Sequence, residues 1–167
     1  MRQYTRCASP FFESPTSRQN PVNAAHNMND LTNKASWTEQ AIYSWAQSGT
    51  RLQRGLSTNE ISKFEALLNF KFPQDFIDLY QRVNGFKDLD WNEHMFSFWP
   101  LDKIIDEYKA DSDNTYVGFC DFLINSYSIG FSKDSKKIFK HFDRQNSVCD
   151  TFKEAVFLIN SSSGDIY

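Results

Sequence analysis

The chain has no apolar segment long enough to cross a bilayer, and its 167 residues include only three cysteines. Its longest apolar run, residues 155–159, falls far short of the roughly 18 residues that a membrane-spanning helix needs. An odd cysteine count without a C-x-x-C pair argues against a disulfide framework. The N-terminus carries charge but no apolar segment of the secretory type. These absences predict a soluble, cytoplasmic protein without a membrane partner.

Sequence signatures of common enzymes and metal proteins are also missing. We find no nucleophile elbow, P-loop, dinucleotide fingerprint or H-E-x-x-H motif. The stretch that begins at Asp111 resembles the start of a calcium loop, but Tyr116 and Phe122 stand where an EF-hand needs glycine and glutamate. Cys120 lies in an apolar run, where a thiol usually packs as a small hydrophobic group. We therefore predict no catalytic residue, no metal site and no cofactor.

Charge is divided unevenly along the chain. Residues 1–55 carry a net charge of +3 and residues 56–167 one of −6, and residues 73–121 alone hold eleven acidic against four basic side chains. Such a surface disfavours direct nucleic-acid binding, which needs clustered lysine and arginine. It favours a basic protein partner through electrostatic complementarity. The alternative is that these acids only solvate helices and loops.

A tail, a folded domain and a short end segment can be distinguished. Residues 1–35 are rich in proline, serine and asparagine without periodicity, which predicts a flexible tail in which Met28 offers an alternative start. Sixteen phenylalanines supply the core of a single domain over residues 36–160. We expect residues 161–167 to form a C-terminal tail that frays.

Helix start and stop signals are unusually complete in residues 56–86. Ser57 and Glu60 have capping-box spacing, Pro73 suits the first position of a second helix that runs to Val83, and Asn84-Gly85 is typical of a left-handed helix stop. The same signals predict helices over 36–47, from Pro100 onward, and over 151–159. Strand patterns cover residues 95–99, 116–119, 126–131 and 137–142. Because helices and strands do not alternate strictly, we predict an α+β domain whose mostly antiparallel sheet packs against helices.

Residues 56–86 resemble the signature of the SUKH superfamily, "I..E..L...LP.D...L...NG". The matching positions are Ile61, Glu65, Leu68, Phe72-Pro73, Asp75, Leu79 and Asn84-Gly85, with Phe72 where leucine is usual. The stretches F-S-F-W-P-L-D-K-I and V-G-F-C-D-F-L-I-N-S-Y-S-I resemble later strands of the family.

The resemblance implies a function without catalysis. The superfamily contains bacterial immunity proteins that neutralise toxins of interbacterial competition, and fungal cell-wall regulators. It suggests an immunity protein that binds a cognate toxin in the cytoplasm, with basic nuclease domains among the candidate partners. The alternative is a regulatory or scaffold module of the fungal type, and an enzyme is the least favoured reading.

One loop has the composition of a partner-binding site. Asp88, Asp90, Trp91 and Glu93 place one tryptophan among three acids. A tryptophan with a charged rim is typical of an interface hot spot. Alternatively, Trp91 folds back onto the sheet edge as part of the core. We predict partner binding by these four residues.

Overall fold

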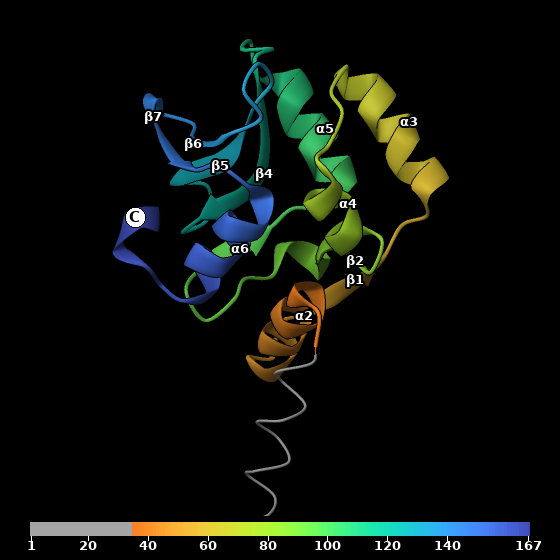
Figure 1. Cartoon of the computed structure of the whole chain (residues 1–167), viewed down its shortest axis with the longest axis vertical. Coiled ribbons are helices and arrows are strands. Elements are labelled where there is room, and N and C mark those ends of the chain that lie inside the picture. The colour runs from red at the N-terminus through yellow and green to blue at the C-terminus, as the bar shows by residue number, and fades with distance from the viewer. Residues whose placement is uncertain (1–34) are drawn as a thin grey trace, which may run out of the picture. The chain divides into compact units, whose positions relative to one another are not determined.

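The computed structural model describes residues 35–167, except for the side chain of Arg144. Within this range a five-stranded antiparallel sheet packs against helices, so the α+β prediction is confirmed (Figure 1). The predicted flexible tail of residues 1–35 lies, apart from residue 35, outside the described residues. The division of the chain into tail, domain and end segment therefore stays a prediction.

The main sheet has the simple order β3-β4-β5-β6-β7, in which each strand is antiparallel to its neighbours. A separate two-stranded sheet pairs β1 with β2. The strands are β1 (Leu52–Arg54), β2 (Val83–Phe86), β3 (Phe96–Phe98), β4 (Tyr116–Phe122), β5 (Tyr127–Ser132), β6 (Ile138–Lys140) and β7 (Asp143–Cys149).

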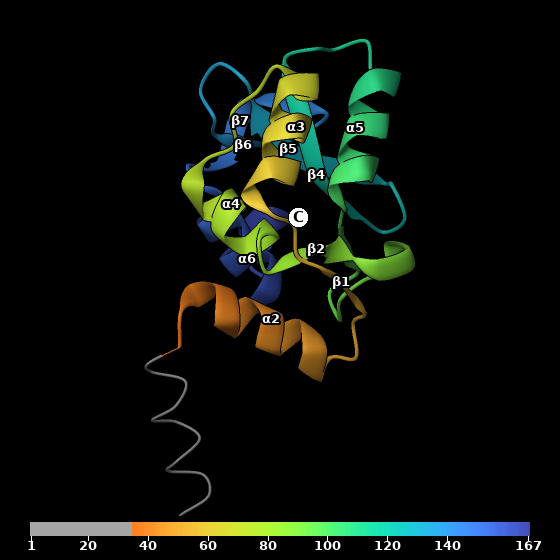
Figure 2. The same cartoon turned by 90° about the vertical axis from the view of Figure 1, so that its right-hand side faces the viewer.

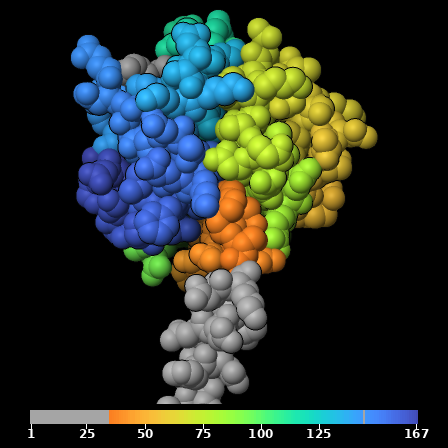
Figure 3. Space-filling model, in the orientation of Figure 1, coloured from red at the N-terminus to blue at the C-terminus, as the bar shows by residue number. Residues whose placement is uncertain are grey.

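Three of the helices open at the capping residues that the sequence predicts. Capping boxes open α2 at Ser36 and α3 at Ser57, and the Thr151 side chain caps α6. The helices are α2 (Trp37–Gln47), α3 (Thr58–Leu68), α4 (Gln74–Tyr80), α5 (Leu101–Ala110) and α6 (Phe152–Asn160), with the 3₁₀ turns η1 (Lys87–Leu89) and η2 (Gly164–Ile166). Both cartoon views place α2 beneath α6 (Figure 2), and the space-filling view shows α2 between the C-terminal residues and the α4 region (Figure 3).

Aromatic rings fill the space between the sheet and helices α4 and α6. Phe152 of α6 contacts Phe119 and Phe131 with ring centroids 5.0 and 6.0 Å apart, and Phe76 of α4 lies 5.0 Å from Phe152. All four are fully buried. Since side chains alternate along a strand, Phe96 and Phe98 face this core and Ser97 faces the opposite side of the sheet.

Three sequence expectations about residues 73–86 need correction. The second helix ends at Tyr80 rather than Val83, and Pro73 is its N-cap rather than its first residue. Asn84-Gly85 is not a helix stop but part of β2, where the Asn84 side chain accepts a hydrogen bond from the Leu101 backbone at the start of α5. Gly85 has φ +66°, and any side chain there would collide with the backbone of Trp99.

The chain end also differs from expectation. The sequence predicts fraying after residue 160, but η2 brings Ile166 into the core, where it is fully buried. The Tyr127 hydroxyl donates a hydrogen bond to the Ile166 carbonyl at 3.1 Å. The apolar contact of one isoleucine thus outweighs the serine-rich composition around it.

Candidate functional site

The loop that follows β2 is held in shape by the side chain of one buried asparagine. Asn92 accepts hydrogen bonds from the backbone N–H groups of His94 and Phe96, both at 3.0 Å. Asp88, Leu89 and Met95 have positive φ between 55° and 65°. Left-handed backbone costs roughly 1–2 kcal/mol per residue for L-amino acids, so the loop is strained and its shape is enforced by its bonds.

Arg51, just before β1, binds two of the three predicted acids. Its Nη1 lies 3.0 Å from Asp88 Oδ2 and its Nε 3.2 Å from Asp90 Oδ2. The Arg51 backbone N–H also donates to Asp90 at 3.1 Å, and this bond, with help from the guanidinium, lowers the pKa of Asp90. The loop is therefore less negative than its sequence suggests, since Arg51 offsets one of these two charges.

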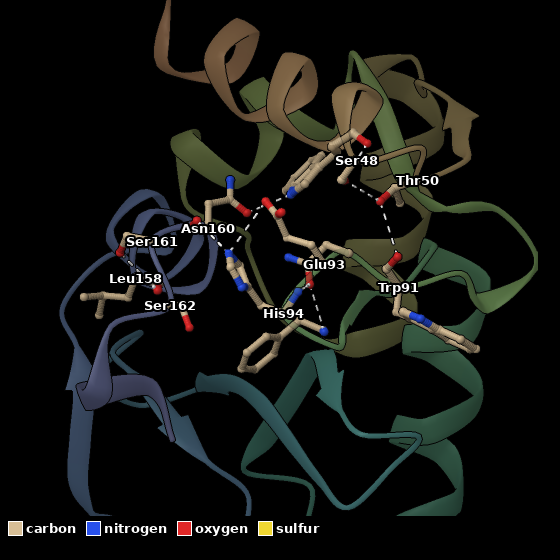
Figure 4. A network of polar contacts seen from close by, with 12 residues as sticks. Ser48, Thr50, Trp91, Glu93, His94, Leu158, Asn160, Ser161 and Ser162 are labelled. Carbon is tan, nitrogen blue, oxygen red and sulfur yellow. Dashed lines mark hydrogen bonds and ion pairs between the residues drawn. The ribbon is translucent and has the colours of Figure 1, made fainter.

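Trp91 and Glu93 point in different directions (Figure 4). The Trp91 carbonyl accepts a hydrogen bond from Thr50, while its indole turns away from His94 and remains 47% exposed. Glu93 lies on the other side, with its carboxylate 3.8 Å from His94 Nε2, and His94 in turn contacts the Asn160 carbonyl at 3.1 Å. The structure thus brings Asp88 and Asp90 together through Arg51, exposes Trp91, and separates Glu93 from them.

A cleft of about 220 Å³ opens beside Trp91, on the face of the sheet opposite the aromatic core. We call it the loop cleft. Its rim carries the exposed Leu89, Trp91 and Ile124 and the partly buried Met95, and its floor carries the buried polar pair Ser97 and Asp121. Leu89 and Ile124 are 49% and 75% exposed, so they form with Trp91 an apolar rim that water covers in the free protein.

The far rim of the loop cleft is strained as well. Leu123, Ile124 and Asn125 connect β4 to β5 with three consecutive positive φ values, 46°, 53° and 64°. A hydrogen bond of 3.0 Å from Leu123 N–H to the Met95 carbonyl ties this turn to the loop after β2. Strain that surrounding bonds maintain concentrates at functional sites, and here it lies on both sides of one cleft.

A second, larger cleft of about 400 Å³ adjoins the first and shares Asn125 with it. Its wall holds Asp111 and His141, with 2.9 Å between Oδ2 and Nε2. The backbone N–H of Asp113, followed by the His141 side chain, lowers the pKa of Asp111. The pair can link α5 to the turn after β6 electrostatically.

Thiol chemistry is suppressed in the described part of the chain. Burial raises the pKa of Cys120 well above its usual value and that of Cys149 to about 12. Both therefore stay protonated at neutral pH, as residues that pack in a core do. Residues 35–167 contain no cluster of three or more side chains arranged to hold a metal ion. No helix among them is both long and apolar enough to span a membrane.

Sequence reasoning missed Arg51, Leu89, Ser97, Asp121 and Ile124. Arg51 is 37 residues from Asp88, and no local pattern announces a contact of that range. The sequence could have indicated Ile124, because it lies between two predicted strands and isoleucine is not a residue that turns favour. It could also have indicated Asp121, which is a single acidic residue within an apolar run.

The sequence of this α+β domain matches a known family. A model of the SMI1 / KNR4 family (SUKH-1) matches residues 55–165, which is about two thirds of the chain. The chain belongs to this family. No curated protein matches the chain. Family membership supports a protein-interaction module.

Proposed function

We propose that this chain is an immunity protein that binds a cognate toxin domain in the cytoplasm and blocks it without catalysis. Support comes from the family, which the sequence signature links to immunity proteins, and from the surface beside the loop after β2. The observation that carries the proposal is the half-exposed Trp91, flanked by Leu89 and Ile124 on two strained segments. Rigid, exposed aromatic and aliphatic side chains around a concave centre are the composition of a binding hot spot.

The negative charge of this surface would favour a basic toxin and speed its association, rather than slow its dissociation. Asp88 and Asp90 already interact with Arg51, so they contribute little free charge to an interface. Residues 73–121 still carry a net charge of −7, which extends over η1, α5 and their loops. Long-range attraction of this kind raises association rates more than it lowers dissociation rates.

The test uses candidate toxin domains taken from the genes that neighbour this one. Trp91→Ala should raise the dissociation rate of the complex and raise its Kd about 30-fold, the equivalent of a 2 kcal/mol hot spot. Phe157→Ala is the matched control, because Phe157 is 69% exposed on α6 and does not line the loop cleft. Surface plasmon resonance measures both rates, and circular dichroism confirms that the variants are folded.

Co-expression in cells completes the test. Wild-type protein should rescue growth when the toxin domain is induced, and Trp91→Ala should rescue less well. Equal loss of affinity for Trp91→Ala and Phe157→Ala would move the interface away from the loop. If the wild-type protein neither binds nor protects, the immunity function is wrong and the regulatory module of the fungal type takes its place.

A further inference from the structure

The floor of the loop cleft contains a buried carboxylate that is hydrogen-bonded only to neutral donors. Asp121 is 5% exposed, and its two oxygens accept hydrogen bonds from the Trp99 indole N–H and from the Asn125 backbone N–H, the latter at 2.9 Å. Among the described residues, no cationic side chain lies within ion-pair distance of it. Buried charges in proteins are normally paired, so the charge of Asp121 is left without a direct ion pair.

Ser97 adds a second, independent observation. It sits directly across from Asp121 in the β3–β4 pairing, on the same face of the sheet. Its Oγ is buried yet has no hydrogen-bond partner, the one such side-chain atom found among the described residues. A buried hydroxyl without a partner is unfavourable, and this one lines the loop cleft.

The other charged groups of the cleft already have partners. Asp88 pairs with Arg51, and Lys103 lies 2.9 Å from Glu107 and over the Trp99 ring. Neither cancels the charge of Asp121 directly. A positive group with several N–H donors would therefore satisfy both Asp121 and Ser97 at the floor of the cleft.

The volume of the loop cleft and the residues at its rim limit which positive group it can bind. Small-molecule sites usually enclose about 300–1,000 Å³, so a cleft of about 220 Å³ suits one side chain better than a whole ligand. A guanidinium has five donors in a planar fork and stacks well on an aromatic face. Asp121 and Ser97 offer acceptors below, and Trp91 offers an indole at the rim.

We propose that the loop cleft is a socket for one arginine side chain of the partner protein. The guanidinium donates to Asp121 and to Ser97 Oγ, and its apolar stem packs between Trp91 and Ile124. This deepens the proposed function, on which it rests only for the partner's identity. It also explains why a surface of this kind would prefer a basic partner.

The socket can be tested without any toxin. We would titrate the ¹⁵N-labelled full chain with n-butylguanidinium and follow the Trp99 indole and Asn125 backbone N–H signals by NMR. Saturable shifts in the millimolar range are expected at these two protons. The neutral analogue n-butylurea, of the same shape, should shift them at least fivefold less. A lysine socket would instead favour n-butylammonium over n-butylguanidinium, which would overturn the arginine assignment.

Variants provide the controls. Asp121→Asn should abolish saturation by n-butylguanidinium. Because that change can disturb the β4–β5 turn, Ser97→Ala is the second variant: it removes the unpartnered hydroxyl, should not lower the melting temperature, and should weaken guanidinium binding at least threefold. Equal response to the urea, or unchanged binding by folded Ser97→Ala and Asp121→Asn, refutes the socket. Since the titration needs no toxin, its failure is distinct from failure of the immunity test.

Discussion

Replacing Phe76 by alanine tests how the α4 helix holds the domain together. Phe76 is fully buried, and its ring stacks on Phe72 at 4.0 Å and on Tyr80 at 3.9 Å. It also meets Phe131 and Phe152 edge-on, at 5.8 and 5.0 Å. Truncating a buried phenylalanine costs about 3–5 kcal/mol. Because four ring contacts vanish, and each is worth about 0.5–1.5 kcal/mol beyond area burial, we expect the upper half of that range.

Guanidinium unfolding followed by far-UV circular dichroism measures the loss. Phe76→Ala should lower the midpoint with an unchanged m-value, which identifies a change in stability rather than in compactness. The melting temperature should fall by roughly 8–20 °C, at about 2–4 °C per kcal/mol for a chain of this size. The exposed Phe157→Ala should stay within about 0.5 kcal/mol of wild type. A Phe76→Ala cost below about 1 kcal/mol would show that the ring does not pack as described.

Two further predictions concern single polar side chains. Glu65 is 6% exposed and accepts a hydrogen bond from the Phe72 backbone N–H at 3.0 Å, so Glu65→Ala should cost about 1–3 kcal/mol in a denaturant titration. Lys71→Ala removes only the exposed ion-pair partner of Glu65 and should cost less than about 1 kcal/mol. Equal costs for the two variants would contradict the role of the backbone hydrogen bond. The pKa of Asp90 is lower in the folded protein than in the unfolded chain, where it is about 3.9, so ionised Asp90 stabilises the fold above that pH. This stabilisation is lost as the pH falls through the pKa of Asp90 in the folded protein. The stability gap between wild type and Asp90→Asn should therefore shrink from pH 6 to pH 3, and a gap that widens would reverse the sign.

Local signals were predictable from sequence because they act within a few residues. The capping boxes Ser36–Glu39 and Ser57–Glu60 each lie within one turn, and both form as expected. The missed elements depend on distant partners or lack an apolar pattern. In the small sheet Leu52 pairs with Phe86 across 34 residues, and β7 is a polar edge strand, D-R-Q-N-S-V-C, without alternation. Pattern reasoning found the loop with Trp91 but not its cleft, since Ser97 and Asp121 become neighbours only through strand pairing.

The signature of the family is fully used by the fold of this chain. Ile61, Leu68 and Leu79 are buried in the core. Glu65 holds the connection from α3 to α4, and Asp75 accepts the Lys153 backbone N–H at 2.8 Å, which ties α4 to the first turn of α6.

The last two signature residues have structural roles as well. Asn84 holds the start of α5, and Gly85 allows the close approach of β2 to the segment after β3. The side-chain oxygens of Glu65, Asp75 and Asn84 thus accept hydrogen bonds that hold the domain together. The signature therefore accounts for the fold, and recognition must come from residues outside it. Leu89 and Trp91 meet that condition, because they lie outside both the signature and the later stretches that resemble the family. They line one concave surface together with Ser97, Asp121 and Ile124, which lie within those later stretches.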